Sequence, residues 1–204
     1  MSGEAFPDND ENPFSTRFVR PGAIEYLFPA DCDLEQLVDR FQQHDARGEI
    51  VGPHGSGKST LLCALLARLA DDSWNVYRCD LRDGQRALPS GWLRTHSREP
   101  RALLAIDGYE QLSRWQRFRV LASCRRHGCG LLVTAHAPVG LPLLWTTEVD
   151  ALRASAVFQK LVPGAFVAEA DLHECLRRDP TNLRATLFAL YDLYEQRRRA
   201  SPGV

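Results

Sequence analysis

Lysine is almost absent from this sequence. Only Lys58 and Lys160 occur, and arginine supplies the rest of the 25 basic side chains. We attribute this bias to genomic base composition, and it makes Lys58 stand out. A compact ammonium that contacts an anion is not interchangeable with a guanidinium.

Features of a secreted or membrane protein are also missing. The N-terminus is acidic and lacks the basic start and apolar run of a signal peptide, and no apolar run approaches the length of a membrane span. The net charge of −1 gives no global indication of a nucleic-acid or membrane partner. We therefore expect a cytoplasmic protein without a membrane partner.

Cysteine is present but shows no metal-binding pattern. The six cysteines are scattered, and in a cytosolic protein we interpret them as reduced core residues. Cys124 and Cys129 flank His127, but their spacing matches no standard zinc pair. No second pair at ligand spacing accompanies them. A zinc site is therefore not expected.

Apolar segments typical of strands alternate with segments typical of helices. Strands are expected at 48–51, 74–81, 102–106 and 130–134, with a short one at 156–161. Helices are expected from Asp33, from the end of the first loop to about residue 70, near Trp92, and at 113–126, 148–154, 168–178 and 181–199. This alternation predicts an α/β fold with three layers and a mostly parallel sheet. The predicted parts are a disordered tail (1–13), the α/β domain (14–165) and a small helical lid (166–200).

One segment fits the phosphate-loop pattern G-x-x-x-x-G-K-[ST] at every fixed position. It lies between the first expected strand and a helix, which is the context that such a loop needs. Its glycines let successive backbone N–H groups point at phosphate oxygens, and the helix directs its positive end at the same anion. The segment predicts nucleotide binding through Gly52, Pro53, His54, Gly55, Ser56, Gly57, Lys58, Ser59 and Thr60. Lys58 is expected to reach the β- and γ-phosphates, and Ser59 to bind Mg²⁺.

Two carboxylates follow the apolar strand at 102–106. Asp107 comes directly after it and is expected to hold Mg²⁺ together with Ser59. Glu110 is the candidate to orient or deprotonate an attacking water, and with Lys58 it forms the predicted catalytic pair. A solvated carboxylate at a helix entry is the alternative interpretation of Glu110.

Three further residues are candidates to sense the γ-phosphate. Thr134 and His136 end the next apolar strand, at the sheet edge where ligands bind in open α/β folds. Arg184 lies in the first turn of the last helix, where the helix dipole disfavours a cation unless an anion or solvent compensates. Tyr26 and Phe28, ahead of the loop, are candidates to stack on a base or to belong to the core.

Together these segments resemble the AAA+/STAND branch of P-loop ATPases, with NACHT-like features, over about residues 14–199. Residues 52–60 match the Walker A motif, and Ile106-Asp107-Gly108-Tyr109-Glu110 is similar to the Walker B motif of that branch. Thr134 and His136 fall where the family keeps its first sensor. Asn182-Leu183-Arg184 is similar to the stretch that carries the second sensor arginine. The resemblance implies a P-loop NTPase fold with a helical lid, and ATP and Mg²⁺ as ligands.

The sequence departs from that family at several points. Position 181 is Thr rather than Gly, the usual first-sensor Asn is missing, and the lid has only two expected helices. No arginine finger is evident; Arg153 is our first candidate, followed by Arg125 and Arg126. A histidine after a similar strand also occurs in ABC ATPases, but their Leu-Ser-Gly-Gly-Gln signature is absent. No Asn-Lys-x-Asp motif for guanine occurs either, which favours ATP.

The sequence thus predicts a Mg-ATP-binding ATPase of AAA+/STAND type that hydrolyses ATP slowly, with lid movement. One alternative is a nucleotide-gated interaction module with little hydrolysis, which reports ATP or ADP occupancy to a protein partner. A second is a small-molecule kinase that uses the arginine-rich segment 82–100 as a substrate lid. The sequence leaves open whether the protein forms a homo-oligomer.

Overall fold

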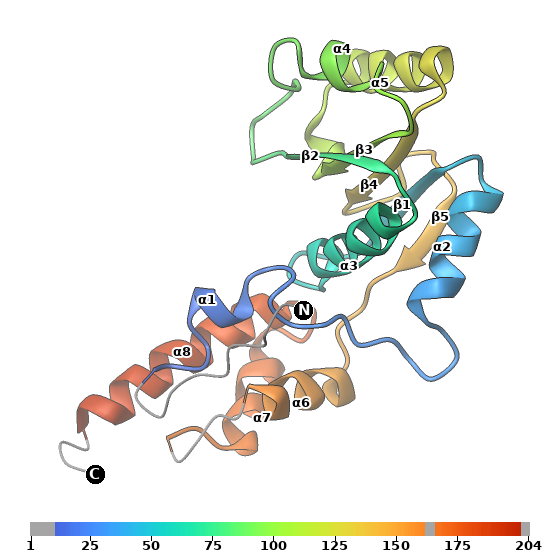
Figure 1. The fold of residues 1–204 in the computed structure, drawn as a ribbon. Helices are drawn as coiled ribbons and strands as arrows, with labels where there is room; N and C mark the ends of the chain where they lie inside the picture. The colour runs from blue at the N-terminus through green and yellow to red at the C-terminus, as the bar shows by residue number, and fades with distance from the viewer. Residues whose placement is uncertain (1–10, 162–165, 201–204) are drawn as a thin grey trace. The chain divides into compact units, whose positions relative to one another are not determined.

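A computed structural model describes residues 11–161 and 166–200 of the 204-residue chain (Figure 1). The chain divides into two compact units. The sheet unit consists of residues 28–52 and 61–147. The helical unit consists of residues 1–27, 53–60 and 148–204, within the described ranges. We describe each unit by itself.

The sheet unit is built on five parallel strands in the order β2-β3-β4-β1-β5. The strands are β1 Arg47–Val51, β2 Asn75–Asp80, β3 Ala102–Asp107, β4 Gly130–Ala135 and β5 Leu143–Thr146. The register pairs the end of β1 with the end of β4 and Ile106 with Val133, so the carboxyl ends of β1, β3 and β4 meet at one edge. Every residue of β4 and all but the last of β3 are buried, as predicted for strands covered on both faces.

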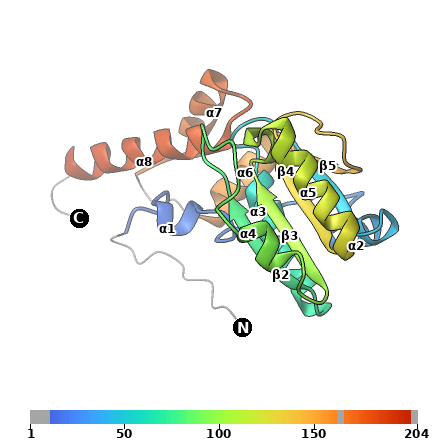
Figure 2. The ribbon, with the colours of Figure 1, turned by 90° about the horizontal axis from the view of Figure 1, so that it is seen from above.

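Helices cover both faces of this sheet, which gives the predicted three layers (Figures 1 and 2). On one face lie α4 Trp92–His96 and α5 Arg114–His127, with the 3-10 turn η1 Tyr109–Gln111. Alternate strand residues such as Leu104 and Leu131 pack there against Val120 and Cys124 of α5. The other face carries α2 Leu34–Gln43 and α3 Lys58–Asp71, whose first three residues belong to the helical unit.

Local signals explain where these helices begin. The Asp33 side chain accepts a hydrogen bond of 2.9 Å from Gln36 N, so it forms the predicted N-cap of α2. Ser113 caps α5 in the same way, through Gln116 N. Gly128 ends α5 in the left-handed conformation, with φ +66°.

The helical unit contains α1 Thr16–Val19, α6 Ala151–Lys160, α7 Glu169–Arg178 and α8 Leu183–Ala200. It has an apolar core of its own, in which Phe14 stacks on Phe158 and Leu172 and Leu190 are fully buried. Asn12 joins the N-terminal segment to α8 by donating to Tyr191 O and Glu195 Oε1. Residues 1–10 of the predicted tail (1–13) lie outside the described residues.

Two parts of the secondary-structure prediction were wrong. The segment 156–161, predicted as a strand, consists of the last residues of α6 and its C-cap Leu161. The start of α6 is fixed by the Asp150 side chain, which accepts from Arg153 N at 2.7 Å. The helix expected at 148–154 is therefore the first part of a longer one. The fifth strand, β5, was not predicted. In the described part of the chain, no helix is long and apolar enough to cross a membrane.

Candidate functional site

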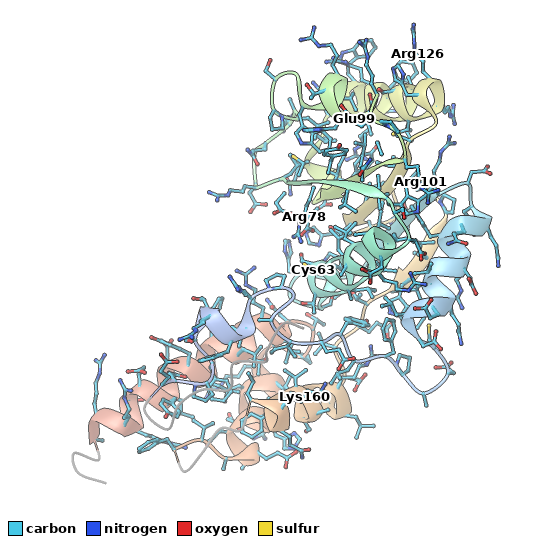
Figure 3. All side chains as sticks on the ribbon, in the orientation of Figure 1. Cys63, Arg78, Glu99, Arg101, Arg126 and Lys160 are labelled. Atoms are coloured by element: carbon cyan, nitrogen blue, oxygen red, sulfur yellow. The ribbon has the colours of Figure 1, made fainter. Side chains whose placement is uncertain are left out.

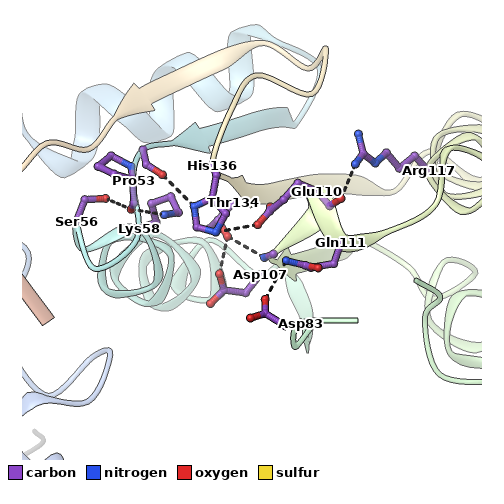
Figure 4. A network of polar contacts seen from close by, with 12 residues as sticks. Pro53, Ser56, Lys58, Asp83, Asp107, Glu110, Gln111, Arg117, Thr134 and His136 are labelled. Atoms are coloured by element: carbon purple, nitrogen blue, oxygen red, sulfur yellow. Dashed lines mark hydrogen bonds and ion pairs between the residues drawn. The ribbon is translucent and has the colours of Figure 1, made fainter. Parts of the chain in front are cut away.

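The predicted phosphate loop has the backbone conformation that its glycines allow. Gly55 and Gly57 have φ values of +70° and +95°, a region that other residues enter only at a cost. Inside the loop, Lys58 Nζ donates to Pro53 O at 2.6 Å, and Ser56 Oγ donates to the same oxygen at 2.8 Å (Figure 4). Lys58 is 8% exposed, so its ammonium is held within the loop rather than in solvent.

A cavity of about 240 Å³ lies beside this loop, entirely within the helical unit. Loop residues 55–60 form one side of it, including Ser59 and Thr60. The remaining lining is largely apolar and comes from the N-terminal segment, α6 and α8; it includes Ile24, Tyr26, Leu27, Val149, Val157, Leu187 and Phe188. Such a cavity offers backbone donors to an anionic group and an apolar surface to a flat ring.

The predicted sensor arginine faces the same cavity. Arg184 is among its lining residues, and its guanidinium lies 5.5 Å from the ring centre of Phe188. The neighbouring Asn182 packs against the loop so closely that a Cβ on Gly55 would lie 1.8 Å from Asn182 Oδ1. The start of α8 therefore touches the phosphate loop, a relationship that the sequence prediction did not contain.

Arg153, the first arginine-finger candidate, lines the cavity of the same chain to which it belongs. Its Nε is bonded to the Asp150 carboxylate. Burial opposes the ionised form of Asp150, but hydrogen bonds from the Arg153 backbone and side chain outweigh it and lower the pKa of that carboxyl. The other arginine-finger candidates, Arg125 and Arg126, lie exposed in the last turn of α5.

In the sheet unit, both oxygens of the Asp107 carboxylate are bonded to protein donors. Thr134 Oγ1 donates to Oδ1 at 2.5 Å and accepts from Gly108 N at 3.0 Å (Figure 4). Arg78, on β2, donates from Nη2 to Oδ2 at 3.2 Å. Thr134, one of the two first-sensor candidates, is thus a hydrogen-bond partner of Asp107.

Arg78 is a site residue that the sequence prediction missed. It also bonds to Asp80 and to Sγ of Cys63; Arg78 and Cys63 are labelled in Figure 3. Burial opposes its charge, but the bonds to Asp80 and Cys63 raise the pKa of the guanidinium. Only the pairing of β2 with β3 brings it to Asp107, and nothing in the sequence signals that contact.

The two remaining candidates of this unit are joined to each other. Glu110 Oε1 lies 3.1 Å from His136 Nε2, and Nδ1 of the same ring lies 3.3 Å from Gly52 O, at the end of β1. Arg117 fixes the backbone of η1 by donating to Glu110 O at 2.6 Å. The second carboxylate oxygen, Glu110 Oε2, is buried and has no hydrogen-bond partner among the described residues. Because a buried carboxylate oxygen ordinarily accepts a bond, this atom is suited to a water or ligand donor.

The other predicted residues divide between the two units. Pro53 and His54 lie exposed in the loop, and Tyr26 lines the cavity. Phe28 belongs to the sheet unit, where it packs edge-on against Trp145. The thiols of Cys124 and Cys129 are buried together; their mutual hydrogen bond and burial raise the pKa of Cys124. No group of three or more His, Cys, Asp or Glu suited to a metal ion occurs within the described ranges.

The sequence matches no protein-family model and no curated protein. The structure, in contrast, is similar to solved AAA+ ATPases. RuvB of Thermotoga maritima, a Holliday junction branch migration motor, aligns with a TM-score of 0.56 at 14% identity, over 82% of this chain and 66% of its own. AMPPCP-bound DnaA from Aquifex aeolicus aligns with a TM-score of 0.55 at 15% identity, over 86% and 67%. NtrX from Brucella abortus, in complex with ATP, aligns with a TM-score of 0.60 at 14% identity, over 88% and 52%.

The chain has an AAA+-like fold. The predicted fold class, with its parallel sheet and C-terminal helices, is confirmed. The chain spans 52–67% of the length of these three solved chains, and at such low identity the likeness shows the fold alone.

Proposed function

We propose that this protein binds Mg-ATP and hydrolyses it slowly, coupled to movement of its C-terminal helices. The observation that carries the proposal is the cavity of the helical unit. It combines the phosphate loop, the Arg184 guanidinium and an apolar wall with Tyr26. These are the donors, the cation and the ring surface that a nucleotide requires.

The residues fit the phosphates of ATP. The positive φ values of Gly55 and Gly57 leave backbone N–H groups free to turn inward, and Lys58 is held where a loop oxygen already attracts its ammonium. Arg184 would bind the γ-phosphate from α8. Asn182, the residue before α8, contacts the loop. A change in the phosphates that the loop holds would therefore shift the start of α8.

The residues of the sheet edge would supply the metal site and the water. Ser59 and Asp107 would hold Mg²⁺, as the resemblance of their segments to the Walker A and Walker B motifs implies. Bound Mg-ATP supplies an electrophilic phosphorus and a cation that neutralises developing charge. Glu110 would orient the attacking water through Oε2, which has no partner in the described part of the chain, while His136 holds the other oxygen. Thr134 and His136 would sense the γ-phosphate from this edge.

Phosphate release from the full chain tests this function. Wild type should release phosphate from Mg-ATP, and Glu110→Gln should release it roughly 100-fold more slowly with ATP affinity retained, because the amide cannot take a proton. Equal rates in the two proteins would remove Glu110 from the mechanism.

The second candidate is a nucleotide-gated interaction module with little hydrolysis. It is favoured by the bonding of Asp107 and Glu110, because three of their four carboxylate oxygens already accept from protein donors. Tight ATP binding with phosphate release at background, at every protein concentration, would support this module over the ATPase. Such a module would bind its protein partner differently in the ATP-bound and ADP-bound states.

A further inference from the structure

The outer face of α5 exposes two large aromatic side chains. Trp115 is 65% exposed and Phe118 is 60% exposed. Their ring centres are 5.7 Å apart and their planes are inclined by 22°, so the rings stack on each other in the open. The buried side of the same helix is formed by Val120 and Cys124. Exposed neighbouring rings of this size mark a contact surface, because solvent alone gives them no stabilisation.

This face is strongly basic, although the whole chain is not. Residues 82–127 contain ten arginines against four acidic residues, a net charge of +6, whereas the chain carries −1. Nine of these arginines are exposed. Arg101 donates to the backbone carbonyls of Asp72 and Ser73, and the other eight are Arg82, Arg86, Arg94, Arg98, Arg114, Arg119, Arg125 and Arg126. In the part of the chain that the structure describes, none of the eight forms an ion pair. Their charge is therefore available to an anionic partner.

The arginines and the rings lie on adjoining elements. The exposed residues of α5 recur at helical spacing, from Arg114 and Trp115 through Phe118 and Arg119 to residues 125–126, where Arg126 is labelled in Figure 3. Ser113 N donates to Arg86 O at 3.0 Å, which holds the preceding loop at the start of α5. A cavity of about 460 Å³ lies between residues 88–94 and α5, with Arg94, Gln116 and Arg119 in its lining.

We propose that this face, α5 with residues 82–98, binds single-stranded nucleic acid. Trp115 and Phe118 would stack on unpaired bases, and the surrounding arginines would contact the phosphates. The rings decide the class of partner. An acidic peptide would use the arginines and leave the rings without planar partners, and a duplex would keep its bases stacked away from them. The site is separate from the proposed nucleotide site, and its test does not depend on ATP binding.

The test is fluorescence anisotropy with labelled 20-nucleotide single strands of DNA and RNA and the corresponding duplex, using the full chain at several salt concentrations. Removing each ring by Trp115→Ala or Phe118→Ala should weaken single-strand binding roughly 5-fold or more, and Trp115→Phe should retain it. Arg114→Gln with Arg119→Gln should reduce the slope of log K against log salt by about 0.7 per arginine. The matched control removes two exposed arginines of α7, by Arg177→Gln with Arg178→Gln, and should leave both quantities unchanged.

Binding of single-stranded DNA or RNA that the ring and arginine variants weaken as stated supports the proposal. The strand that binds more tightly identifies the nucleic acid. Three results would overturn it: no binding of a single strand at low salt, equal weakening by the α7 control, or affinity that is unaffected by removal of both rings. Polyglutamate that displaces the labelled strand equally well from wild type and from the ring variants would also overturn it, and would favour an acidic protein partner. Because both rings are exposed, the variants should melt at the wild-type temperature. The chain has four tryptophans, so the difference in fluorescence quenching between wild type and Trp115→Phe gives a second readout.

Discussion

His136 Nε2 lies 3.1 Å from Glu110 Oε1, and this contact ties the end of β4 to the 3-10 turn after β3. The ring is also fixed from its other side, by the contact of Nδ1 with Gly52 O. Glu110 is therefore held at one oxygen, and its other oxygen has no partner among residues 11–161 and 166–200. The pair has the form of a water-positioning carboxylate with a supporting imidazole.

Removing the imidazole should release Glu110. We expect His136→Ala to slow phosphate release about 10-fold or more while ATP affinity changes only a few-fold, since the change affects orientation of the carboxylate more than phosphate contacts. Single-turnover and binding measurements on the same protein separate the two effects. Wild-type turnover in this variant would show that the contact has no catalytic role.

Replacing Arg78 should lower the Mg²⁺ concentration that nucleotide binding requires. Arg78→Gln removes a cation bonded to Asp107 Oδ2, and the unopposed carboxylate should bind Mg²⁺ about 10-fold more tightly. Titration of Mg²⁺ against fluorescent ATP analogue binding measures this shift. Arg82→Gln is the control, because it removes an equal charge from an exposed position that forms no ion pair with the described residues. An unchanged or higher Mg²⁺ requirement in Arg78→Gln contradicts the assignment.

The contact of Gly55 with Asn182 predicts a specific steric effect. Gly55→Ala should weaken ATP binding about 10-fold or more, because its Cβ would collide with Asn182 Oδ1 and displace the loop or the start of α8. Gly84→Ala is the matched control: Gly84 has φ +84° but open space around it, so it shares the backbone strain of about 1 kcal/mol without the collision. The double variant Gly55→Ala with Asn182→Ala should recover part of the affinity. Equal ATP affinity in the two glycine variants would refute the steric argument.

The ion pair between α7 and α8 predicts a pH effect on stability. Arg197 donates to both oxygens of Asp171, at 2.7 and 2.8 Å, and this hydrogen bonding lowers the pKa of the carboxyl. A lowered folded-state pKa contributes stability above the unfolded-state pKa, near 4, which is lost as the pH falls through the folded-state value. Asp171→Asn should therefore cost about 1 kcal/mol or less at pH 7, since Arg197 is 44% exposed, and progressively less as the pH falls below the unfolded-state pKa. Urea unfolding at pH 7 and at low pH checks this; a cost that persists at low pH would point to another cause.

Local patterns predicted most of the sheet and the phosphate loop because they depend on neighbouring residues. The continuous apolar runs of β3 and β4, the Asp33 cap and the glycines of the loop carry their own signals. The apolar run at 156–161 was ambiguous, and the Asp150 cap that starts α6 was the stronger signal. The four-residue β5 carries too little pattern, since only one of its residues is buried.

Contacts between distant residues could not be predicted in the same way. Asp107 and Glu110 were predicted as site residues from their spacing, and that assignment stays a prediction. The approach of Arg78 depends on strand register, and that of Asn182 on how α8 packs within the helical unit. The basic face of α5 was hidden by the near-zero charge of the whole chain, because the excess of arginine lies in residues 82–127 alone.

The most direct test of the account is Mg-ATP binding, measured by calorimetry, in Lys58→Ala against Lys160→Ala. The chain has no other lysine, and Lys160 makes a surface ion pair with Glu25 at 3.0 Å, so the two variants lose the same group from different places. Wild type and Lys160→Ala should bind Mg-ATP equally, and Lys58→Ala should bind it about 10- to 100-fold more weakly, the loss expected for a charged hydrogen bond to phosphate. The same affinity in both variants, or no binding by wild type at millimolar Mg-ATP, would contradict the account.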